Sequence, residues 1–405
     1  MPGTPEQPRI LDGIRVVELT DFVAGPFAGR ILSDFGADVI KIEPPRGDSA
    51  RRRGPFAHAA PHRETSALFL HYNTNKRGLR LDIGTRAGLR LLNTLLDDAD
   101  VFLSDLEPSE LERYGLTTVR EGRPSLIVAS ITPHGLHGPA VDLPSTPYTR
   151  MHGAGTAHVL VRGLGADLGK PLPTGAYVNE ADGGTACAIA TLAALIARGP
   201  DRGMGDGQVA EVSVLEAMSS LDRVELSISR NDAPGRPMGR RGLFGGRLKC
   251  KDGYVICAMP QPHQWAGMVH AMGDPDWALD DDGNPVQRSD ENAEMLFKNL
   301  SAWCADHTRE EIYRSAQSRG APVGPIYSPS EVMASEQEAA RGFFRPLDHE
   351  VAGTLQYTTT SALYSQAAPP PNAAAPLLGE ANGHLLAPSL GDGWSAATAR
   401  RAGVA

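Results

Sequence analysis

LDGIRVVELTDFVAGPFAGRILSDFGADVIKIEPPRGD, residues 11–48, is the stretch that decides the fold. It starts with a β-rich run at 15–19, and a loop then leads to apolar residues at helical spacing over 27–35, which stop at Gly36. A second strand-like run follows at 37–42 and ends before two prolines. This order is that of a β-α-β unit, which predicts two parallel strands joined by a right-handed crossover.

The same alternation continues outward from this unit. Strand-like and helical patterns follow one another, with strands expected at 79–82, 101–103, 126–130 and 208–214 and helices at 86–96 and 183–198. The fold class predicted is therefore α/β, with a Rossmann-like large domain that contains a parallel sheet.

Composition changes near residue 230, where Gly and Arg gather, and a hairpin turn is expected at Lys251-Asp252-Gly253. A smaller α+β domain is predicted from this change. The expected domains are 1–225 as the first part of the large domain, 226–328 as the small domain, and 329–405 as a return segment that completes the large domain. The segment 369–376 (PPPNAAAP) is expected to run along the surface and not to form part of the core.

Length, charge and cysteine usage exclude several classes of protein. The 405 residues suit two domains, and the net charge of −9 argues against nucleic acid or an anionic membrane as a partner. No apolar stretch reaches the roughly 18 residues that span a bilayer, and the first 13 residues do not have the layout of a signal peptide. The four cysteines include no CxxC pair, so neither a zinc site nor a disulfide framework is expected. We expect a cytoplasmic protein with no bound metal.

The common phosphate and hydrolase motifs are missing from the sequence. GxxxxGK[ST] and GxSxG do not occur, and the glycines at 163–169 miss the GxGxxG spacing by one residue. His134 and His137 are three residues apart, but no third ligand is suggested, so a polar loop is favoured over a metal site.

Six blocks in order give the chain a family resemblance. They are residues 11–48, NTNKRGLRLDI (73–83), ADVFLSDLEPSELERYGL (99–116), GDGQVAEVSVLEAM (205–218), APVGPIYSPSEV (321–332) and APLLGE (375–380). Together they span nearly the whole chain. The sequence resembles the class III CoA-transferases, the family of formyl-CoA transferase and α-methylacyl-CoA racemase.

This resemblance implies a function and an assembly. It implies transfer of coenzyme A from an acyl-CoA to a carboxylic acid through a carboxylate-bound intermediate, in an interlocked homodimer. One alternative is an isomerase, racemase or lyase that uses the same carboxylate as a general base. The racemase histidine position falls at Thr146 here, which weakens that alternative. Another alternative is a catalytically inactive CoA-binding homologue.

The family's nucleophile is an aspartate shortly before a long Ala-rich helix. A gap-free count back from that helix places Glu180 at this position and Gly184 at the glycine that follows, whereas Asp182 would need a shift of two residues. A carboxylate can attack a thioester to give a mixed anhydride. Both acids are retained as candidates, and the plain alternative is that Glu180 is an exposed acid at the start of a helix.

The resemblance also implies residues that contact CoA. Basic side chains there could pair with phosphates. The matching or neighbouring positions are Ala24, Arg46, Lys76, Leu81, Asp105 and Arg113. Asp105-Leu106-Glu107 stands where the family usually has Asn-Phe followed by Arg or Gly, so this contact is expected to differ in detail.

Overall fold

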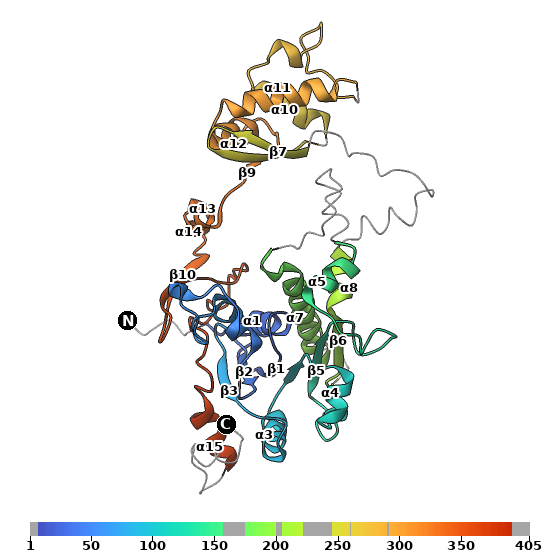
Figure 1. The fold of residues 1–405 in the computed structure, drawn as a ribbon, viewed down its shortest axis with the longest axis vertical. Helices are drawn as coiled ribbons and strands as arrows, with labels where there is room; N and C mark the ends of the chain where they lie inside the picture. The colour runs from blue at the N-terminus through green and yellow to red at the C-terminus, as the bar shows by residue number, and fades with distance from the viewer. Residues whose placement is uncertain are drawn as a thin grey trace. The chain divides into compact units, whose positions relative to one another are not determined.

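The computed structural model of the protein describes residues 7–156, 175–199, 205–221, 245–259, 261–289 and 291–390 (Figure 1). The chain divides into two compact units. The first unit comprises Met1–Ser229 and Arg341–Ala405, and the second comprises Arg230–Ala340. The domain boundary expected after residue 225 lies outside the described residues.

A six-stranded sheet forms the centre of the first unit. Its strand order is β3-β2-β1-β4-β5-β6, and every neighbouring pair is parallel. The strands are β1 (Arg15–Leu19), β2 (Asp38–Glu43), β3 (Arg77–Arg80), β4 (Val101–Ser104), β5 (Ile127–Thr132) and β6 (Val209–Ser213). The parallel β-α-β unit expected from residues 11–48 is thus confirmed. The strand order reverses between β1 and β4, and in open sheets of this kind ligands bind at that point, outside the carboxyl ends of the strands.

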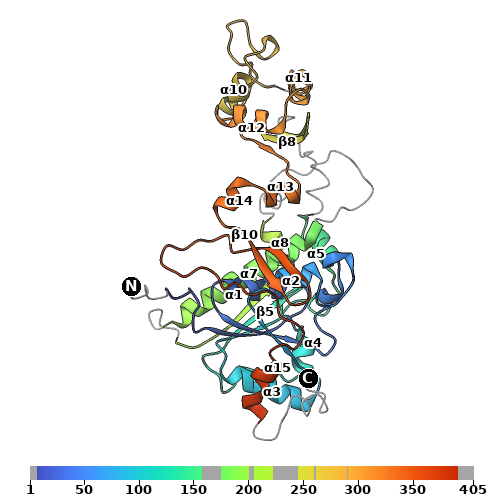
Figure 2. The same ribbon diagram turned by 90° about the vertical axis from the view of Figure 1, so that its left-hand side faces the viewer.

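Helices cover both faces of this sheet, as Figures 1 and 2 show. On one face lie α1 (Ala24–Asp34), α5 (Pro147–Gly153), α7 (Val178–Arg198) and α8 (Val214–Leu221). On the other face lie α3 (Arg86–Asp97), α4 (Pro108–Arg113) and α15 (Asn382–Leu390). Each face therefore has its own apolar core, and the central strands are buried on both sides.

The long helix α7 crosses α1 closely because Gly184 has no side chain. A Cβ at this position would lie 2.5 Å from the carbonyl oxygen of Ala24. Among the described residues, α7 is the one helix whose length and composition would also suit a membrane span, but it packs against α1, β5 and β6 as a core helix does. It begins five residues earlier than the sequence pattern indicated, and Glu180 therefore lies in its first turn.

A smaller core closes the first unit near β3. It joins α2 (Ala67–Tyr72) to the antiparallel hairpin of β10 (Phe344–His349) and β11 (Gly353–Thr358). The expectation that 369–376 stays out of the core is wrong in part, because Ala375 is buried in this cluster. The segment is held against the rest of the unit by a hydrogen bond from the Ala373 N–H to Asn75 Oδ1 (2.8 Å).

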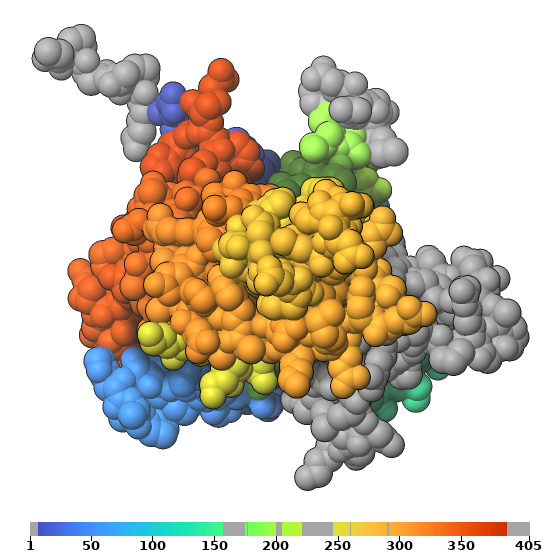
Figure 3. Space-filling view, turned by 90° about the horizontal axis from the view of Figure 1, so that it is seen from above, coloured from blue at the N-terminus to red at the C-terminus, as the bar shows by residue number. Residues whose placement is uncertain are grey.

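The second unit contains a three-stranded antiparallel sheet and helices. Its strands are β7 (Gly245–Cys250), β8 (Gly253–Ala258) and β9 (Val323–Pro325). The expected hairpin is confirmed, because Cys250 of β7 pairs with Gly253 of β8. Its helices are α10 (Pro262–Ala271), α11 (Ala293–Ala305), α12 (Arg309–Gln317), α13 (Pro329–Met333) and α14 (Glu336–Ala340). The first three pack around the buried Trp265 in a core of their own. Figure 3 draws the atoms of this unit in yellow to orange.

Candidate active site

A cavity of about 460 Å³ opens in the first unit at the carboxyl ends of the parallel strands. Its lining comes from the segments that follow β1 to β5 and from the starts of α1, α7 and α8. It therefore lies at the reversal of strand order, where this type of sheet binds its ligands. The lining residues used below are Asp21, Phe22, Ala24, Arg46, Leu81, Asp105, Tyr114, Arg150 and Glu180.

Glu180 forms part of the cavity wall and is paired with Arg150. The Arg150 Nε and Nη2 atoms donate to the same carboxylate oxygen, Oε1 of Glu180, at 3.0 and 2.7 Å. Both side chains are nearly enclosed, with exposures of 8% for Arg150 and 4% for Glu180. The alternative that Glu180 is an exposed acid at the start of a helix is therefore wrong. Neither hydrogen bond uses the second carboxylate oxygen.

Burial and Arg150 have opposite effects on the pKa of the Glu180 carboxyl. Burial raises the pKa of the Glu180 carboxyl, and Arg150 counteracts that rise through its charge and its hydrogen bonds. The net effect is a carboxyl whose pKa is higher than usual, although a cation is bonded to it. Such balanced groups on a cavity wall are typical of catalytic acids and bases.

Local sequence features fix both partners of this pair. Helix α5 begins with Pro147 in its first turn and is capped by Thr146, whose hydroxyl accepts from the Thr149 N–H. This cap holds Arg150 on the buried side of a short helix. At the start of α7, Tyr177 has a left-handed backbone with φ of 57°.

Tyr177 contacts Phe22 edge to face, with ring centroids 4.8 Å apart. Phe22 lies in the loop after β1 and also has a positive φ, 73°. Left-handed backbone is uncommon for aromatic residues, and such strain is concentrated at functional sites. The contact joins the start of the Glu180 helix to the loop that precedes α1.

Asp105 lines the cavity beyond β4. Its Oδ2 accepts a hydrogen bond from the Asp21 N–H at 2.7 Å. Burial raises the pKa of the Asp105 carboxyl well above its usual range, although this hydrogen bond opposes the rise. A neutral Asp105 would present an O–H donor, as an asparagine at this position would present an N–H donor.

Beneath the cavity lies a group of buried ions that we call the interior charge cluster. Glu18 accepts ion pairs from two lysines: Lys41 Nζ lies 3.1 Å from Oε1, and Lys76 Nζ lies 2.8 Å from Oε2. Lys41 also lies 2.8 Å from Asp48 Oδ2. The remaining members are Glu43, Arg51 and Glu64, in which Arg51 bonds both glutamates. Five of these residues belong to the motif blocks (Glu18, Lys41, Glu43, Asp48 and Lys76), so part of that sequence pattern encodes the interior of the fold.

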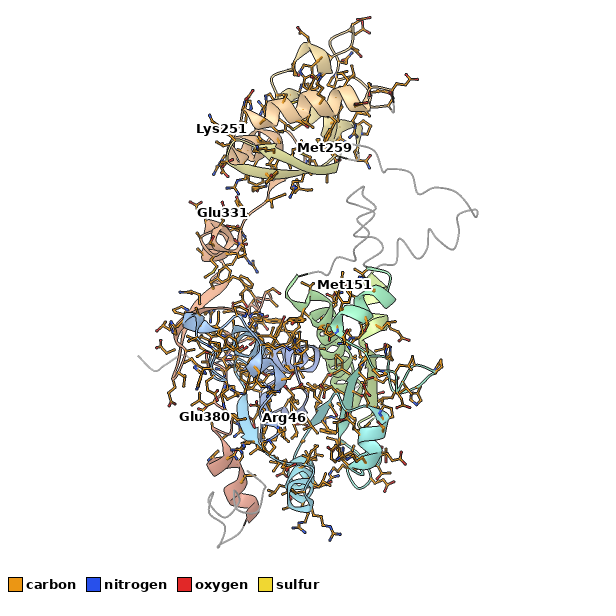
Figure 4. All side chains as sticks on the ribbon, in the orientation of Figure 1. Arg46, Met151, Lys251, Met259, Glu331 and Glu380 are labelled. Carbon is orange, nitrogen blue, oxygen red and sulfur yellow. The ribbon has the colours of Figure 1, made fainter. Side chains whose placement is uncertain are left out.

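The structure brings some of the predicted site residues together and separates others. Ala24, Arg46, Leu81, Asp105 and Glu180 all line the cavity. Arg46, labelled in Figure 4, is an exposed side chain that follows the carboxyl end of β2.

Three predicted residues do not line the cavity. Lys76 lies in the interior charge cluster, where burial lowers the pKa of its ammonium to about 8. Asp182 is half-buried on α7, away from the lining. Arg113 is exposed and lies 5.3 Å from the ring of Tyr114, which does line the cavity.

Sequence reasoning missed Arg150. Its partner Glu180 is 30 residues away, and no motif links the two. Of the two histidines considered as ligands, His137 is exposed and lies 2.9 Å from Glu211. Among the described residues, no group of three or more His, Cys, Asp or Glu side chains is arranged to hold a metal ion.

Comparison with known proteins points to one enzyme family. The profile of CoA-transferase family III matches residues 11–382. Succinyl-CoA:mesaconate CoA-transferase of Haloarcula hispanica is 28% identical over 394 residues, which cover 93% of this chain and 95% of that protein. Formyl-CoA:oxalate CoA-transferase of Streptomyces avermitilis is 29% identical over 410 residues, which cover 95% and 96% of the two chains.

A solved structure has the same fold. The crystal structure of a CaiB/BaiF family protein from Brucella suis superposes with a TM-score of 0.79 at 27% identity, covering 94% of this chain and all of that one. The match to the family profile spans both units and every lining segment of the cavity. The resemblance read from the six sequence blocks is confirmed, and this chain belongs to CoA-transferase family III.

Proposed function

We propose that this enzyme moves CoA from an acyl-CoA thioester to a carboxylic acid, with Glu180 as the nucleophile. The observation that carries the proposal is the position of Glu180: a buried carboxylate on the wall of a cavity, with one oxygen held by Arg150 and the other not engaged by it. The curated relatives named above are CoA-transferases, which supports the same reaction class here.

The chemistry follows from a carboxylate nucleophile. A Glu180 oxygen attacks the acyl carbonyl carbon, the C–S bond breaks, and CoA leaves as its thiolate, so that a mixed anhydride forms. The thiolate then attacks the glutamyl carbonyl carbon, which releases the donor acid as a carboxylate and leaves a glutamyl-CoA thioester. The acceptor carboxylate repeats these two steps in reverse, and its acyl-CoA leaves with the Glu180 carboxylate restored.

The cavity can bind the CoA moiety of the substrate. Ala24 is at the start of α1, where free backbone N–H groups favour an anion, and Leu81 and Asp105 provide apolar and polar wall. Among the described residues that line the cavity, Arg46 and Arg150 are the arginines, and Arg150 is held by Glu180. We therefore assign the phosphate contact to Arg46, with Arg113 beside Tyr114 as a second one. Lys76 is not included, because its side chain is fully buried beside Glu18.

The assembly and location are also part of the proposal. We propose an interlocked homodimer in the cytoplasm, in which the second unit acts as a distinct small domain. The family resemblance supports this arrangement. Light scattering at micromolar concentration should give twice the mass of the chain, and a monomer would contradict it.

One experiment tests the nucleophile. The enzyme is incubated with formyl-CoA or succinyl-CoA and an acid from the panel of oxalate, mesaconate and glutarate, then treated with hydroxylamine, and its peptides are analysed by mass spectrometry. We expect the hydroxamate on the peptide that contains Glu180. Glu180→Gln should reduce kcat at least about 1,000-fold while the affinity for CoA changes little, because an amide is a far weaker nucleophile.

The same experiment separates the alternatives. If Asp182→Asn abolishes transfer and Glu180→Gln does not, the nucleophile is two residues further along α7. Exchange of the α-proton of an acyl-CoA without adduct formation would indicate an isomerase or racemase that uses the carboxylate as a base. CoA binding without either reaction would indicate an inactive homologue.

A further inference from the structure

Arg150 is an enclosed cation whose counter-ion is the proposed reacting group. Two of its nitrogens bond Oε1 of Glu180, and its Nη1 donates to Ser145 Oγ at 3.2 Å. Only 8% of its side chain is exposed. A guanidinium does not lose its proton under these conditions, so Arg150 stays charged throughout turnover.

The charge of Glu180 does not stay constant in the mechanism proposed above, on which this inference rests. Once a Glu180 oxygen is acylated, or its carbonyl carries CoA, the side chain is neutral. Arg150 then remains in the same enclosed place without a counter-ion. A buried charge that loses its partner is strongly unfavourable, and a new anion at this point would be correspondingly favoured.

Such an anion is present at the right stage of the reaction. When the glutamyl-CoA thioester forms, one carboxylate disappears from Glu180 and one appears on the released acid, so the number of carboxylates is unchanged. We propose that Arg150 binds the carboxylate of the acid substrate and exchanges it with the carboxylate of Glu180 in each half-reaction. The two nitrogens that now face one oxygen can instead take both oxygens of a free carboxylate in a planar fork.

The surroundings favour Arg150 over the other cations for this role. Arg46 also lines the cavity but is exposed, whereas Arg150 directly contacts Glu180. Lys76 is committed to Glu18 in the interior. The substrate class that follows is an acid that binds as its anion at the wall of the cavity, next to the reacting carbonyl.

Binding of free acids to an uncharged variant tests the proposal without turnover. Glu180→Gln imitates the neutral state, so it should bind succinate or oxalate at least tenfold more tightly than the wild-type enzyme in calorimetry. The double variant Glu180→Gln/Arg150→Gln should lose this gain. Arg198→Gln in the Glu180→Gln background is the matched control. Arg198 is on α7, as Glu180 is, and its pair with Asp100 does not border the cavity, so its loss should leave acid binding unchanged.

Two results would overturn the assignment. One is equal acid affinity in the single and double variants, and the other is equal affinity in the wild-type enzyme and Glu180→Gln. Where the double variant does not fold, Glu180→Gln/Arg150→Lys keeps the charge but loses the planar fork, and it should bind both acids at least threefold more weakly than Glu180→Gln. Unchanged binding would then count against the proposal.

The kinetic readout separates this inference from the proposed function. Arg150→Lys should raise the KM for the acid at least tenfold and leave the KM for the acyl-CoA within about twofold. If the wild-type enzyme forms the Glu180 adduct but Arg150→Lys does not change the KM for the acid, the role proposed for Arg150 is wrong and the nucleophile stands. If no adduct forms, the nucleophile fails, and the binding measurements still decide what Arg150 does.

Discussion

The interior charge cluster around Glu18 and the Arg150–Glu180 pair are both buried in the first unit, and both join segments that are distant in sequence. In the cluster, each carboxylate oxygen of Glu18 faces a different lysine, and Lys41 and Arg51 each contact two acids. In the pair, one oxygen of Glu180 takes both bonds, and the carboxylate forms part of a cavity wall.

This difference separates a structural set of charges from an exchangeable one. A cluster in which each ion has several partners holds strands and helices in one register, and no member can change partner without leaving another unpaired. A single pair that borders a cavity can exchange one member for a ligand of the same charge. Burial alone therefore does not distinguish the two roles, whereas the number of partners and the contact with the cavity do.

The largest effect on stability should come from removing one charge from the interior charge cluster. Glu18→Gln leaves Lys41 and Lys76 with less counter-charge in a fully buried site, so we expect a loss of about 3–5 kcal/mol in the free energy of unfolding. Urea denaturation followed by circular dichroism measures this loss. Glu180→Gln is the comparison variant: it also leaves a buried cation, Arg150, without its counter-ion, but an anion from solution can reach Arg150 through the cavity. With succinate in the buffer, Glu180→Gln should therefore lose less stability than Glu18→Gln. Equal losses would remove the distinction between the two sets.

A smaller effect on stability should come from a steric clash with the Glu18 carboxylate. A Cβ on Gly29 of α1 would lie 1.9 Å from Oε2 of Glu18, which Lys76 holds in place. Gly29→Ala should therefore cost about 1–3 kcal/mol by displacing either α1 or the ion pair. Gly383→Ala in α15 is the control, since nothing lies within 4 Å of the added carbon. If Gly29→Ala leaves the free energy of unfolding unchanged, the Glu18 carboxylate is free to move.

The smallest effect concerns the pH dependence of Asp105. Because the pKa of Asp105 is raised well above 3.8, the folded state binds its proton more tightly than the unfolded state does. Stability from this group is complete below pH 3.8 and declines as pH rises through the raised pKa.

Asp105→Asn should remove this decline and should be more stable than the wild type at the upper end of that window. We expect less than about 1 kcal/mol, because the side chain is half-buried and screened by water. Urea midpoints at pH 5 and pH 8 for both proteins measure the effect. A wild-type protein that loses no more stability than Asp105→Asn between these values would contradict the prediction.

The sheet could be predicted from the sequence because local patterns carry it. The run at 15–19 coincides with β1, and the apolar spacing after it marks α1, although the helix begins at Ala24 because Pro26 is tolerated in a first turn. Glycine positions such as Gly184, by contrast, can be explained only once α1 is known to lie against α7.

The site was less predictable because it depends on pairings across the fold. Lys76 belongs to a motif block, and its basic side chain suggests a phosphate contact. In the structure it is instead paired in the interior with Glu18 of β1. The sequence favours Glu180 as the nucleophile but leaves an exposed acid as an alternative, which only the cavity excludes. No periodicity or spacing links Arg150 to it, so that pairing could not be predicted from the single sequence.

The contact between Phe22 and Tyr177 has a mechanical consequence. Lys41 in the sheet fixes Asp48 at 2.8 Å, and Asp48 Oδ1 accepts from the Phe22 N–H at 3.1 Å. Phe22 in turn meets Tyr177, at the start of the helix that carries Glu180, at 4.8 Å. These three contacts connect the start of the Glu180 helix to strand β2, so the position of the reactive carboxylate is fixed by the buried sheet. Surface loops do not take part in this connection. A substitution at the surface should therefore displace the Glu180 carboxylate far less than a change to the ring of Phe22 or Tyr177.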